Sequence, residues 1–398
     1  MTRFEPFAGV RYDPERVELA DVVAPPYDVI DDAMRATLEA RSPYNAARVE
    51  RVPVGAQARD LTPPGCVVRD WLDQGVLVRD DAPGFYVYRM GHRDAEGRAR
   101  QTAGVIGALA LSAPGEDEVL PHERTVGTPS VHRLAQLRAC RANLSPIWGL
   151  SPVSGLSALC ELPGPPVARC TDDDDVHHRL WHITQPGVVD AIAAAVASAP
   201  VVIADGHHRY ETALAYRDEQ RRANGGRAGP YDLLMAYVVE LTGEQLDVRP
   251  IHRLVRGLPN GIDVLAALAP WFDVFDAPAP PEALPAHADD AGALGLVLSG
   301  GAWLLRPRPS PADETDELDV VHLDRALATL PPHTLDYEPD VGRILAAVRS
   351  GEGDAGVLLR PVSLDQIANA ARRHSPMPEK TSFFYPKPRT GLVFRMLD

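Results

Sequence analysis

The sequence predicts an α+β fold built around a mixed, partly antiparallel sheet. Its β-like and helical segments follow one another too irregularly for a doubly wound parallel sheet. A short apolar run, VVIA at 201–204, is followed at once by a helical pattern, which indicates a buried strand leading into a helix. With 398 residues, of which 45% are apolar and 24% charged, the chain has an ordinary globular composition and the length of two or three domains.

Residues 1–112 are predicted to form a β-rich N-terminal part. The stretch VELADVVAPPYDVI ends a short apolar strand at a Pro-Pro pair, because proline restricts itself and its predecessor to extended geometry. The stretch CVVRDWLDQGVL has apolar residues at helical spacing and stops at Gly75. Residues 85–111 alternate, turn at 94–97 and alternate again, which predicts a hairpin.

Residues 113–256 are predicted to form a central α/β part. SVHRLAQLRAC and PGVVDAIAAAVAS have helical patterns, and they are followed by the strand at 201–204 and a helix from about Arg209 to Asn224. Residues 257–398 are predicted to form an α+β C-terminal part. Its proline- and alanine-rich tract, FDAPAPPEALPAHADDAG, is read as an internal boundary or a long surface loop, and ALGLVLSGGAWLLRP as a strand pair.

The overall charge and the cysteines bound the class of protein. A formal charge of −15 argues against nucleic acid as the main partner, because affinity for phosphate backbones comes largely from an excess of Lys and Arg. The 4 cysteines show neither a CxxC pair nor zinc spacing, which favours a reducing cytoplasm. We expect no secretory signal and no membrane span, since every apolar run is short or interrupted. The sequence does not indicate an oligomeric state.

The joint between strand and helix, Asp205 to Arg209, is the most informative stretch. A helix N-terminus leaves backbone N–H groups without partners and carries a partial positive charge, so it is suited to bind an anion. Gly206 allows close approach, Arg209 offers a planar fork, and His207 and His208 offer switchable donors. These residues predict a phosphate cradle. The alternatives are a helix capped by Asp205 with ordinary surface histidines, or a metal site on the two histidines.

Two other phosphate-binding devices are excluded. GxxxxGK[ST] is absent, and the only two lysines, Lys380 and Lys387, lie near the C-terminus. No GxGxxG follows a strand, so a Rossmann nucleotide site lacks its fingerprint.

The stretch IADGHHRYETAL resembles the strand, GxHRxxA and helix element of the ParB/sulfiredoxin superfamily, which includes free-serine kinases. Gly206, His208, Arg209 and Ala213 match that pattern. The chain as a whole is similar to the DUF1015 family, through APPYDVI, SPYNAARVE, VLPHERT, IADGHHRYETALAYRDE, PIHRLV and MPEKTSFFYPKPRTGLVFRM. The resemblance implies a ParB/sulfiredoxin-like core element with family-specific additions.

VLPHERT also resembles the Pro-His-Glu stretch in which free-serine kinases place their catalytic glutamate. By that resemblance Glu123 is the general base. From the requirements of phosphoryl transfer we expect Asp205 to hold Mg²⁺ or to orient a histidine, with His208 also in the catalytic set. ATP, ADP or pyrophosphate is the expected phosphate donor. The alternative interpretation of PHERT is a surface turn with an ion-paired glutamate.

Further candidate residues lie in the other family-like stretches. We assign a role in substrate binding to a set of polar residues beside turns, aromatic residues or short strands: His122, Arg124, Asp28, Asn45, Arg48, Arg253, Lys380, Thr381 and Lys387. Tight turns and ordinary ion pairs explain the same residues equally well. The acidic stretch TDDDDVHH is read as a solvated loop, since consecutive aspartates point in different directions.

Together these observations predict a small-molecule phosphotransferase that acts on free serine, O-phosphoserine or a similar hydroxyl amino acid. A phosphatase that uses the same site with water as the acceptor is the first alternative. A non-catalytic nucleotide-binding switch of ParB-like type is the second, although no basic helix-turn-helix segment supports binding to DNA.

Overall fold

The computed structural model describes residues 2–50, 64–94, 97–113, 115–124, 131–161, 164–277, 281–308 and 318–398. The chain forms two compact units, which are described separately. The first comprises Met1–Asp247 with Pro386–Asp398, and the second comprises Val248–Tyr385. The division into parts 1–112, 113–256 and 257–398, with one compact unit as the alternative, stays a prediction.

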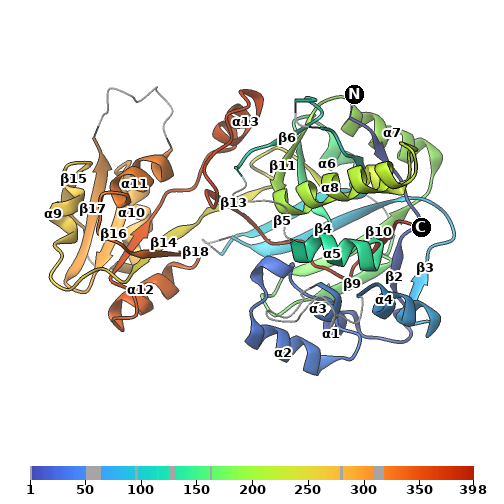
Figure 1. Cartoon of the computed structure of the whole chain (residues 1–398), viewed down its shortest axis with the longest axis horizontal. Helices are drawn as coiled ribbons and strands as arrows, with labels where there is room; N and C mark the ends of the chain where they lie inside the picture. Colours follow the sequence, from blue (N-terminus) through green and yellow to red (C-terminus); the bar gives the residue numbers. More distant parts are fainter. Residues whose placement is uncertain are drawn as a thin grey trace. The chain divides into compact units, whose positions relative to one another are not determined.

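The first unit is built on a nine-stranded mixed sheet, which confirms the predicted fold class (Figure 1). Two neighbouring pairs are parallel, and the rest of the sheet is antiparallel. The strand order is β6 (Val119–Pro121), β11 (Val201–Asp205), β8 (Ile147–Ser151), β12 (Leu233–Glu240), β5 (Ala99–Ala110), β4 (Phe85–Arg93), β10 (His177–Ile183) and β9 (Ala168–Thr171), with β1 (Phe4–Glu5) beside β5.

The predicted hairpin of residues 85–111 is confirmed as strands β4 and β5. Tyr86 lies opposite Ile106, and the antiparallel register continues to Arg93 opposite Ala99. The tip of the predicted turn falls on residues 95 and 96, outside the described residues. Both strands are buried along most of their length, and Phe85 of β4 and Val105 of β5 lie in the core beneath the helices.

One face of the sheet is covered by helices that follow β8, β10 and β11. These are α6 (Leu156–Leu159), α7 (Pro186–Ala197) and α8 (His207–Ala223). Ile192 of α7 and Tyr210 of α8 are buried in the same core as Ile203 of β11. Helix α8 begins two residues before the predicted start at Arg209, so both histidines belong to its first turn.

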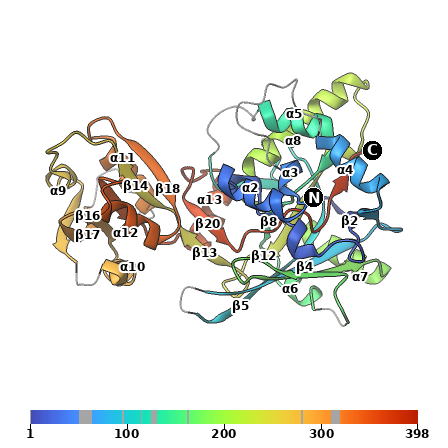
Figure 2. The same cartoon turned by 90° about the horizontal axis from the view of Figure 1, so that it is seen from below.

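The N-terminal segments, whose ribbons are drawn in blue in Figure 2, contribute to a second core of buried side chains. It contains side chains of the following elements: β2 (Val10–Tyr12), α1 (Leu19–Val22), α2 (Asp32–Arg41), α3 (Ala47–Glu50), α4 (Pro64–Asp73) and β3 (Leu77–Arg79). The turn η1 (Tyr27–Val29) has no buried residue. Helix α5 (Val131–Cys140) and the pair of β7 (Ala142–Asn143) with β21 (Arg395–Met396) complete it. The last residues of the chain therefore return to the first unit.

The second unit is a six-stranded antiparallel sheet with helices on both faces. Its order is β15 (Phe272–Asp276), β17 (Gly301–Pro307), β16 (Leu294–Leu298), β19 (Ala355–Leu358), β14 (His252–Arg256) and β18 (Thr334–Glu338). Helices α9 (Val264–Leu268) and α11 (Asp319–Leu327) pack on one face, and α10 (Leu284–Asp290) and α12 (Val341–Arg349) on the other. Further elements are helix α13 (Leu364–Arg372), the pair of β13 (Asp247–Pro250) with β20 (Ser382–Tyr385), and, in the first unit, the 3-10 turn η2 (Pro230–Asp232).

The proline- and alanine-rich tract lies inside the second unit, where a boundary or a long loop was expected. Its residues form a 3-10 turn, η3 (Pro281–Ala283), followed by α10. Leu284 and Ala288 are buried, so the expectation of a loop was wrong for this part of the tract. Alanine at helical spacing outweighs the proline content because Pro285 stands in the first turn of α10, where no hydrogen bond from its nitrogen is needed.

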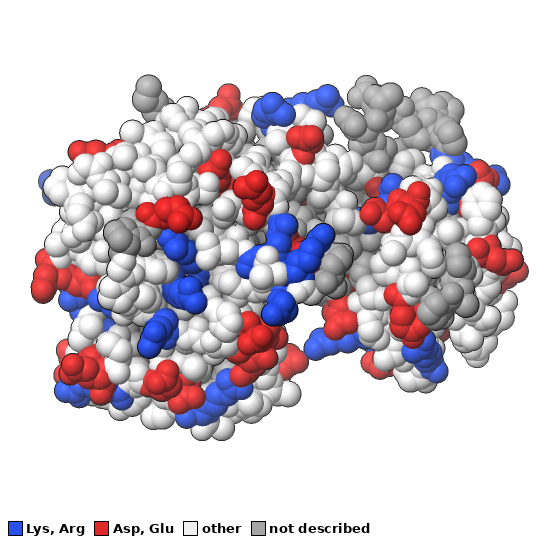
Figure 3. Space-filling model, turned by 180° about the vertical axis from the view of Figure 1, so that it is seen from behind, with Lys and Arg blue, Asp and Glu red and all other residues white. Residues whose placement is uncertain are grey.

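Two surface properties bear on possible partners: the distribution of charged side chains and the apolar character of the helices. Figure 3 shows acidic and basic side chains interspersed over one face, so the net charge of −15 is not gathered there into a single acidic patch. Over the described ranges, no helix has the length and apolar character needed to cross a membrane. A cytoplasmic location stays a prediction.

Candidate active site

Two sequence motifs meet because β6 and β11 are parallel neighbours. Val201 lies opposite Val119, and Ile203 lies opposite Pro121. The carboxyl ends of parallel strands meet at the same edge of a sheet, so the residues that follow each strand are brought together there. His122 and Glu123 follow β6, while Gly206 and the start of α8 follow β11.

Gly206 makes the turn from β11 into α8 possible. Its φ is +93°, in the left-handed region that favours glycine. A Cβ at this position would lie 2.9 Å from Cγ2 of Ile147 and 3.0 Å from Nε of Arg209. No side chain among the described residues caps the helix, so the first amides of α8 keep their capacity to bind an anion.

Replacement of Gly206 by alanine is expected to destabilise the protein by about 2–4 kcal/mol, because left-handed strain adds to the overlap with Ile147. The matched control is Gly225→Ala. Gly225 has a φ of +73°, but no atom lies within 4 Å of the place where a Cβ would stand, so only the strain of about 1–2 kcal/mol applies. Urea unfolding of both variants measures the difference. Equal losses would contradict the close approach at Gly206.

Asp205 ends β11 and carries the counter-charge for two cations. Its Oδ2 accepts a hydrogen bond of 2.6 Å from Nη2 of Arg209, and its Oδ1 is bound by the ammonium of Lys387. The three side chains are only 10–15% exposed. This arrangement joins a residue of the C-terminal segment to the strand-helix joint.

The charges of this cluster stabilise one another. Burial alone would raise the pKa of Asp205, but the positive charges of Lys387 and Arg209 outweigh it and hold that pKa below its usual value. Burial alone would lower the pKa of Lys387, and the charges of Asp205 and Asp28 outweigh it in the opposite direction. Asp205 is therefore ionised and Lys387 protonated at neutral pH.

The predicted metal role of Asp205 does not fit this geometry. Both carboxylate oxygens are bound by cationic side chains, which a divalent cation would have to displace. Within the described parts of the chain, no cluster of three or more His, Cys, Asp or Glu side chains has the geometry of a metal site. The surroundings of Asp205 suit a role as the counter-ion of Lys387 and Arg209.

Glu123 lies between two histidines. Nε2 of His122 is 3.3 Å from Oε1 of Glu123, and Nδ1 of His122 lies 2.5 Å from the carbonyl oxygen of Ile203. The backbone N–H of Glu123 donates a long hydrogen bond of 3.4 Å to Nε2 of His207. The rings of His122 and His207 are 5.0 Å apart, so PHERT and DGHHR form one cluster.

The two adjacent histidines of α8 have different surroundings. Burial, followed by the charge of His122, lowers the pKa of His207 to about 3, so its ring is neutral at physiological pH. The side chain of His208 is 45% exposed and lies 3.8 Å from Glu211 one turn later. His208 is thus the more accessible of the two histidines to a ligand at the helix N-terminus.

Arg209 also connects the joint to a polar chain on the other side of the helix. Nη1 donates to Pro146 O at 2.5 Å and to Oγ of Ser145 at 3.2 Å, and Ser145 in turn donates to Oε1 of Glu50 at 2.8 Å. Arg133 donates to the backbone oxygen of Glu50 at 2.6 Å. The guanidinium of Arg133 lies 3.4 Å from the centre of the Tyr27 ring.

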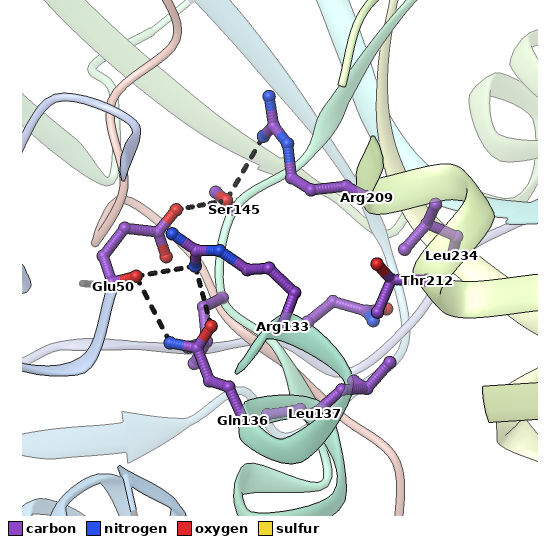
Figure 4. Close-up of a pocket in the computed structure, with 11 residues that line it drawn as sticks. Glu50, Arg133, Gln136, Leu137, Ser145, Arg209, Thr212 and Leu234 are labelled. Atoms are coloured by element: carbon purple, nitrogen blue, oxygen red, sulfur yellow. Dashed lines mark hydrogen bonds between the residues drawn. The ribbon is translucent and has the colours of Figure 1, made fainter. Parts of the chain in front are cut away.

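A cavity of about 60 Å³ lies beside this chain, between α5 and α8 (Figure 4). Its walls include the side chains of Glu50, Arg133, Gln136, Ser145, Arg209 and Thr212. One water needs about 10–15 Å³ by this measure. The cavity has room for a few waters or a group of phosphate size, but not for a nucleotide.

Sequence reasoning missed several residues of this region, namely Tyr27, Glu50, Arg133 and Ser145. Tyr27 and Glu50 stand inside the family-like stretches APPYDVI and SPYNAARVE, which was the available signal. No pattern in the sequence pointed to Arg133, because a single arginine on a helix is most often a surface residue.

The other predicted site residues have varied surroundings. Asp28 is exposed, but its charge acts on Lys387 and Arg209. Asn45 is fully buried. Its Nδ2 donates to the backbone oxygens of Asp21 and Val23, and its Oδ1 accepts from the backbone N–H of Ala47. These bonds fit the alternative interpretation of Asn45 as a residue that stabilises a tight turn. Arg48 binds Glu39. Arg124 is exposed.

Three predicted residues belong to the second unit. Arg253 is buried, donates to Ile251 O at 2.7 Å and stacks on Tyr337. Thr381 donates to Pro378 O at 2.6 Å, and Lys380 has a positive φ of 57°. Their predicted role in substrate binding stays a prediction.

The acidic stretch of residues 171–178 is only partly the solvated loop that was expected. The side chain of Asp174 is 67% exposed, but that of Asp172 is 7% exposed. Asp172 accepts hydrogen bonds from Nε2 of His178 at 2.8 Å and from Arg389, and Nδ1 of His178 lies 2.7 Å from the hydroxyl of Tyr88. This network anchors the C-terminal segment two residues after Lys387.

Comparisons with known proteins add the family. A search of curated proteins finds no match to the chain. Among solved structures, a variant of a free serine kinase in complex with AMP is 13% identical, with 69% of this chain and 89% of that chain covered and a TM-score of 0.39. A conserved hypothetical protein from Pyrococcus furiosus is 13% identical, with 70% of this chain and 90% of that chain covered and a TM-score of 0.37. SbnI with a C-terminal truncation from Staphylococcus aureus is 12% identical, with 73% of this chain and 87% of that chain covered and a TM-score of 0.38.

At these identities and TM-scores, none of the three structures says what this chain binds or acts on. The family comparison is stronger. Residues 4–325, well over half of the chain, match the family described as protein of unknown function DUF1015. The chain therefore belongs to the DUF1015 family.

Proposed function

We propose that the protein is a phosphotransferase that binds phosphate at the N-terminus of α8 and transfers a phosphoryl group to the hydroxyl of a small molecule. Free serine and O-phosphoserine are the substrates that the resemblance to free-serine kinases suggests. ATP, ADP or pyrophosphate is the donor.

The observation that carries this proposal is the parallel pairing of β6 with β11, which places Glu123 beside the uncapped start of α8. Phosphoryl transfer needs neutralisation of negative charge, a positioned acceptor and little covalent chemistry from the protein. The helix amides, His208 and the cations of Arg209 and Lys387 supply the first requirement. Glu123 supplies a group that can take the acceptor's proton.

In the proposed reaction, the acceptor oxygen forms a bond to phosphorus while the bond from phosphorus to the donor's bridging oxygen breaks. The hydroxyl proton passes to Glu123. Asp205 keeps Lys387 and Arg209 in place and stays ionised. A divalent cation bound to the donor's phosphates, such as Mg²⁺, would supply additional positive charge there.

Turnover assays test the proposal directly. Purified protein is incubated with L-serine, Mg²⁺ and ATP, ADP or pyrophosphate in turn, and phosphoserine formation is measured. We expect formation with at least one donor. A second incubation with O-phosphoserine alone measures phosphate release, which would instead support a phosphatase. Absence of both activities, with binding of a nucleotide by calorimetry, would contradict catalysis and leave a nucleotide-binding switch.

A further inference from the structure

His122 is a buried histidine with one ring nitrogen fixed by the backbone. Its side chain is fully buried, and Nδ1 lies 2.5 Å from the carbonyl oxygen of Ile203 in β11. A carbonyl oxygen only accepts hydrogen bonds, so Nδ1 must carry a proton. The other ring nitrogen, Nε2, is therefore a bare acceptor whenever the ring is neutral.

Nε2 faces the carboxylate of Glu123 at 3.3 Å from Oε1. An ionised carboxylate also accepts hydrogen bonds only. If the His122 ring were neutral and Glu123 ionised, the lone pair of Nε2 would face a lone pair of Oε1, and the two atoms would repel each other. One proton between Nε2 and Oε1 turns this repulsion into a charge-assisted hydrogen bond.

The surroundings favour a proton at this position and not on the neighbouring ring. His207 lies 5.0 Å away and accepts the backbone N–H of Glu123, so its Nε2 is unprotonated. The charged or titratable groups that act on His207 are His122, Glu123, Asp205 and His208, and Asp205 is in turn held by Lys387 and Arg209. Burial and the charge of His122 keep His207 neutral.

We propose that His122 is a positioning residue that shares one proton with Glu123 and fixes the orientation of its carboxylate, while neutral His207 holds the backbone of Glu123. The inference deepens the proposed function and rests on it for the role of Glu123 as base. It replaces the expected role of His122 in substrate binding with a role that acts through Glu123.

The test uses the full chain with 15N-labelled histidine, observed by NMR at pH 7. The signals of His122 are assigned by their loss in H122N. We expect both ring nitrogens of His122 to be protonated in the wild type. In E123Q the side-chain amide donates to Nε2, so Nε2 should lose its proton while Nδ1 keeps it. Glu211→Gln, which alters the carboxylate beside His208, should leave His122 unchanged.

An unprotonated Nε2 in the wild type, or a fully protonated ring in E123Q, would overturn the proposal. The readout requires no turnover, so it stands or falls separately from the phosphotransferase assays. Where turnover is found, H122N gives a second readout. Its amide can reproduce the bond from Nδ1 to Ile203 but cannot reach Glu123, so turnover should fall by up to about 100-fold with little change in KM. Unaltered turnover in folded H122N would contradict the positioning role.

Discussion

Replacement of Glu123 by glutamine is expected to lower the rate of phosphoryl transfer by about 10²- to 10⁴-fold, the range that a general base contributes. Glutamine has nearly the same shape but cannot take a proton from the acceptor hydroxyl. Its amide can still hydrogen-bond to His122, and the backbone N–H that binds His207 is untouched. We therefore expect a low kcat in a folded protein with KM little changed.

The measurement is the initial rate with the donor identified in the turnover assay, over a range of acceptor concentrations. The matched control is Glu211→Gln in the second turn of α8, where a carboxylate lies 3.8 Å from His208 on the same helix. Its activity should stay near that of the wild type. If E123Q retains a rate within about threefold of the wild type, the proton is taken by another group or by water, and Glu123 is not the base.

The sequence predicts the local parts of this site better than their assembly. The apolar run 201–204, the glycine after it and the helical pattern from Arg209 are neighbours in the chain, and each follows from short-range preferences. The run and the helical pattern become β11 and α8, as expected, and Gly206 between them takes a left-handed φ, which had not been predicted. The hairpin of β4 and β5 was predictable for the same reason.

The partners of these residues come from distant positions. Asp205 is 182 positions from Lys387, and Ile203 is 81 positions from His122. Which strands become neighbours depends on packing of the whole sheet, and no local pattern encodes that β6 pairs with β11. A family resemblance was needed to connect Glu123 with Gly206. The acidic side chains of Asp205 and Asp172 were interpreted without their arginine and lysine partners, because those partners lie far away in the sequence.

Replacement of Asp205 by asparagine is expected to destabilise the first unit by about 3–5 kcal/mol at pH 7, because it leaves two buried cations without their counter-charge. Urea unfolding measures the loss. Lys387→Met in the D205N background removes one orphaned cation and should restore part of the stability. A suitable control is Glu219→Gln, which breaks an ion pair with Arg138 that is 35–49% exposed and should cost no more than about 1 kcal/mol.

The dependence on pH separates a charge effect from a packing effect. Because the pKa of Asp205 is lower in the folded protein than its ordinary value of 3.8, ionised Asp205 stabilises the fold above that pH. This stabilisation by ionised Asp205 is lost as the pH falls through the pKa that Asp205 has in the folded protein. The difference in unfolding free energy between wild type and D205N should therefore be constant from neutral pH down to about 5 and shrink below about 4. A difference that is the same at pH 3 and pH 7 would show that shape, and not the charge of Asp205, holds Lys387 and Arg209 at the start of α8.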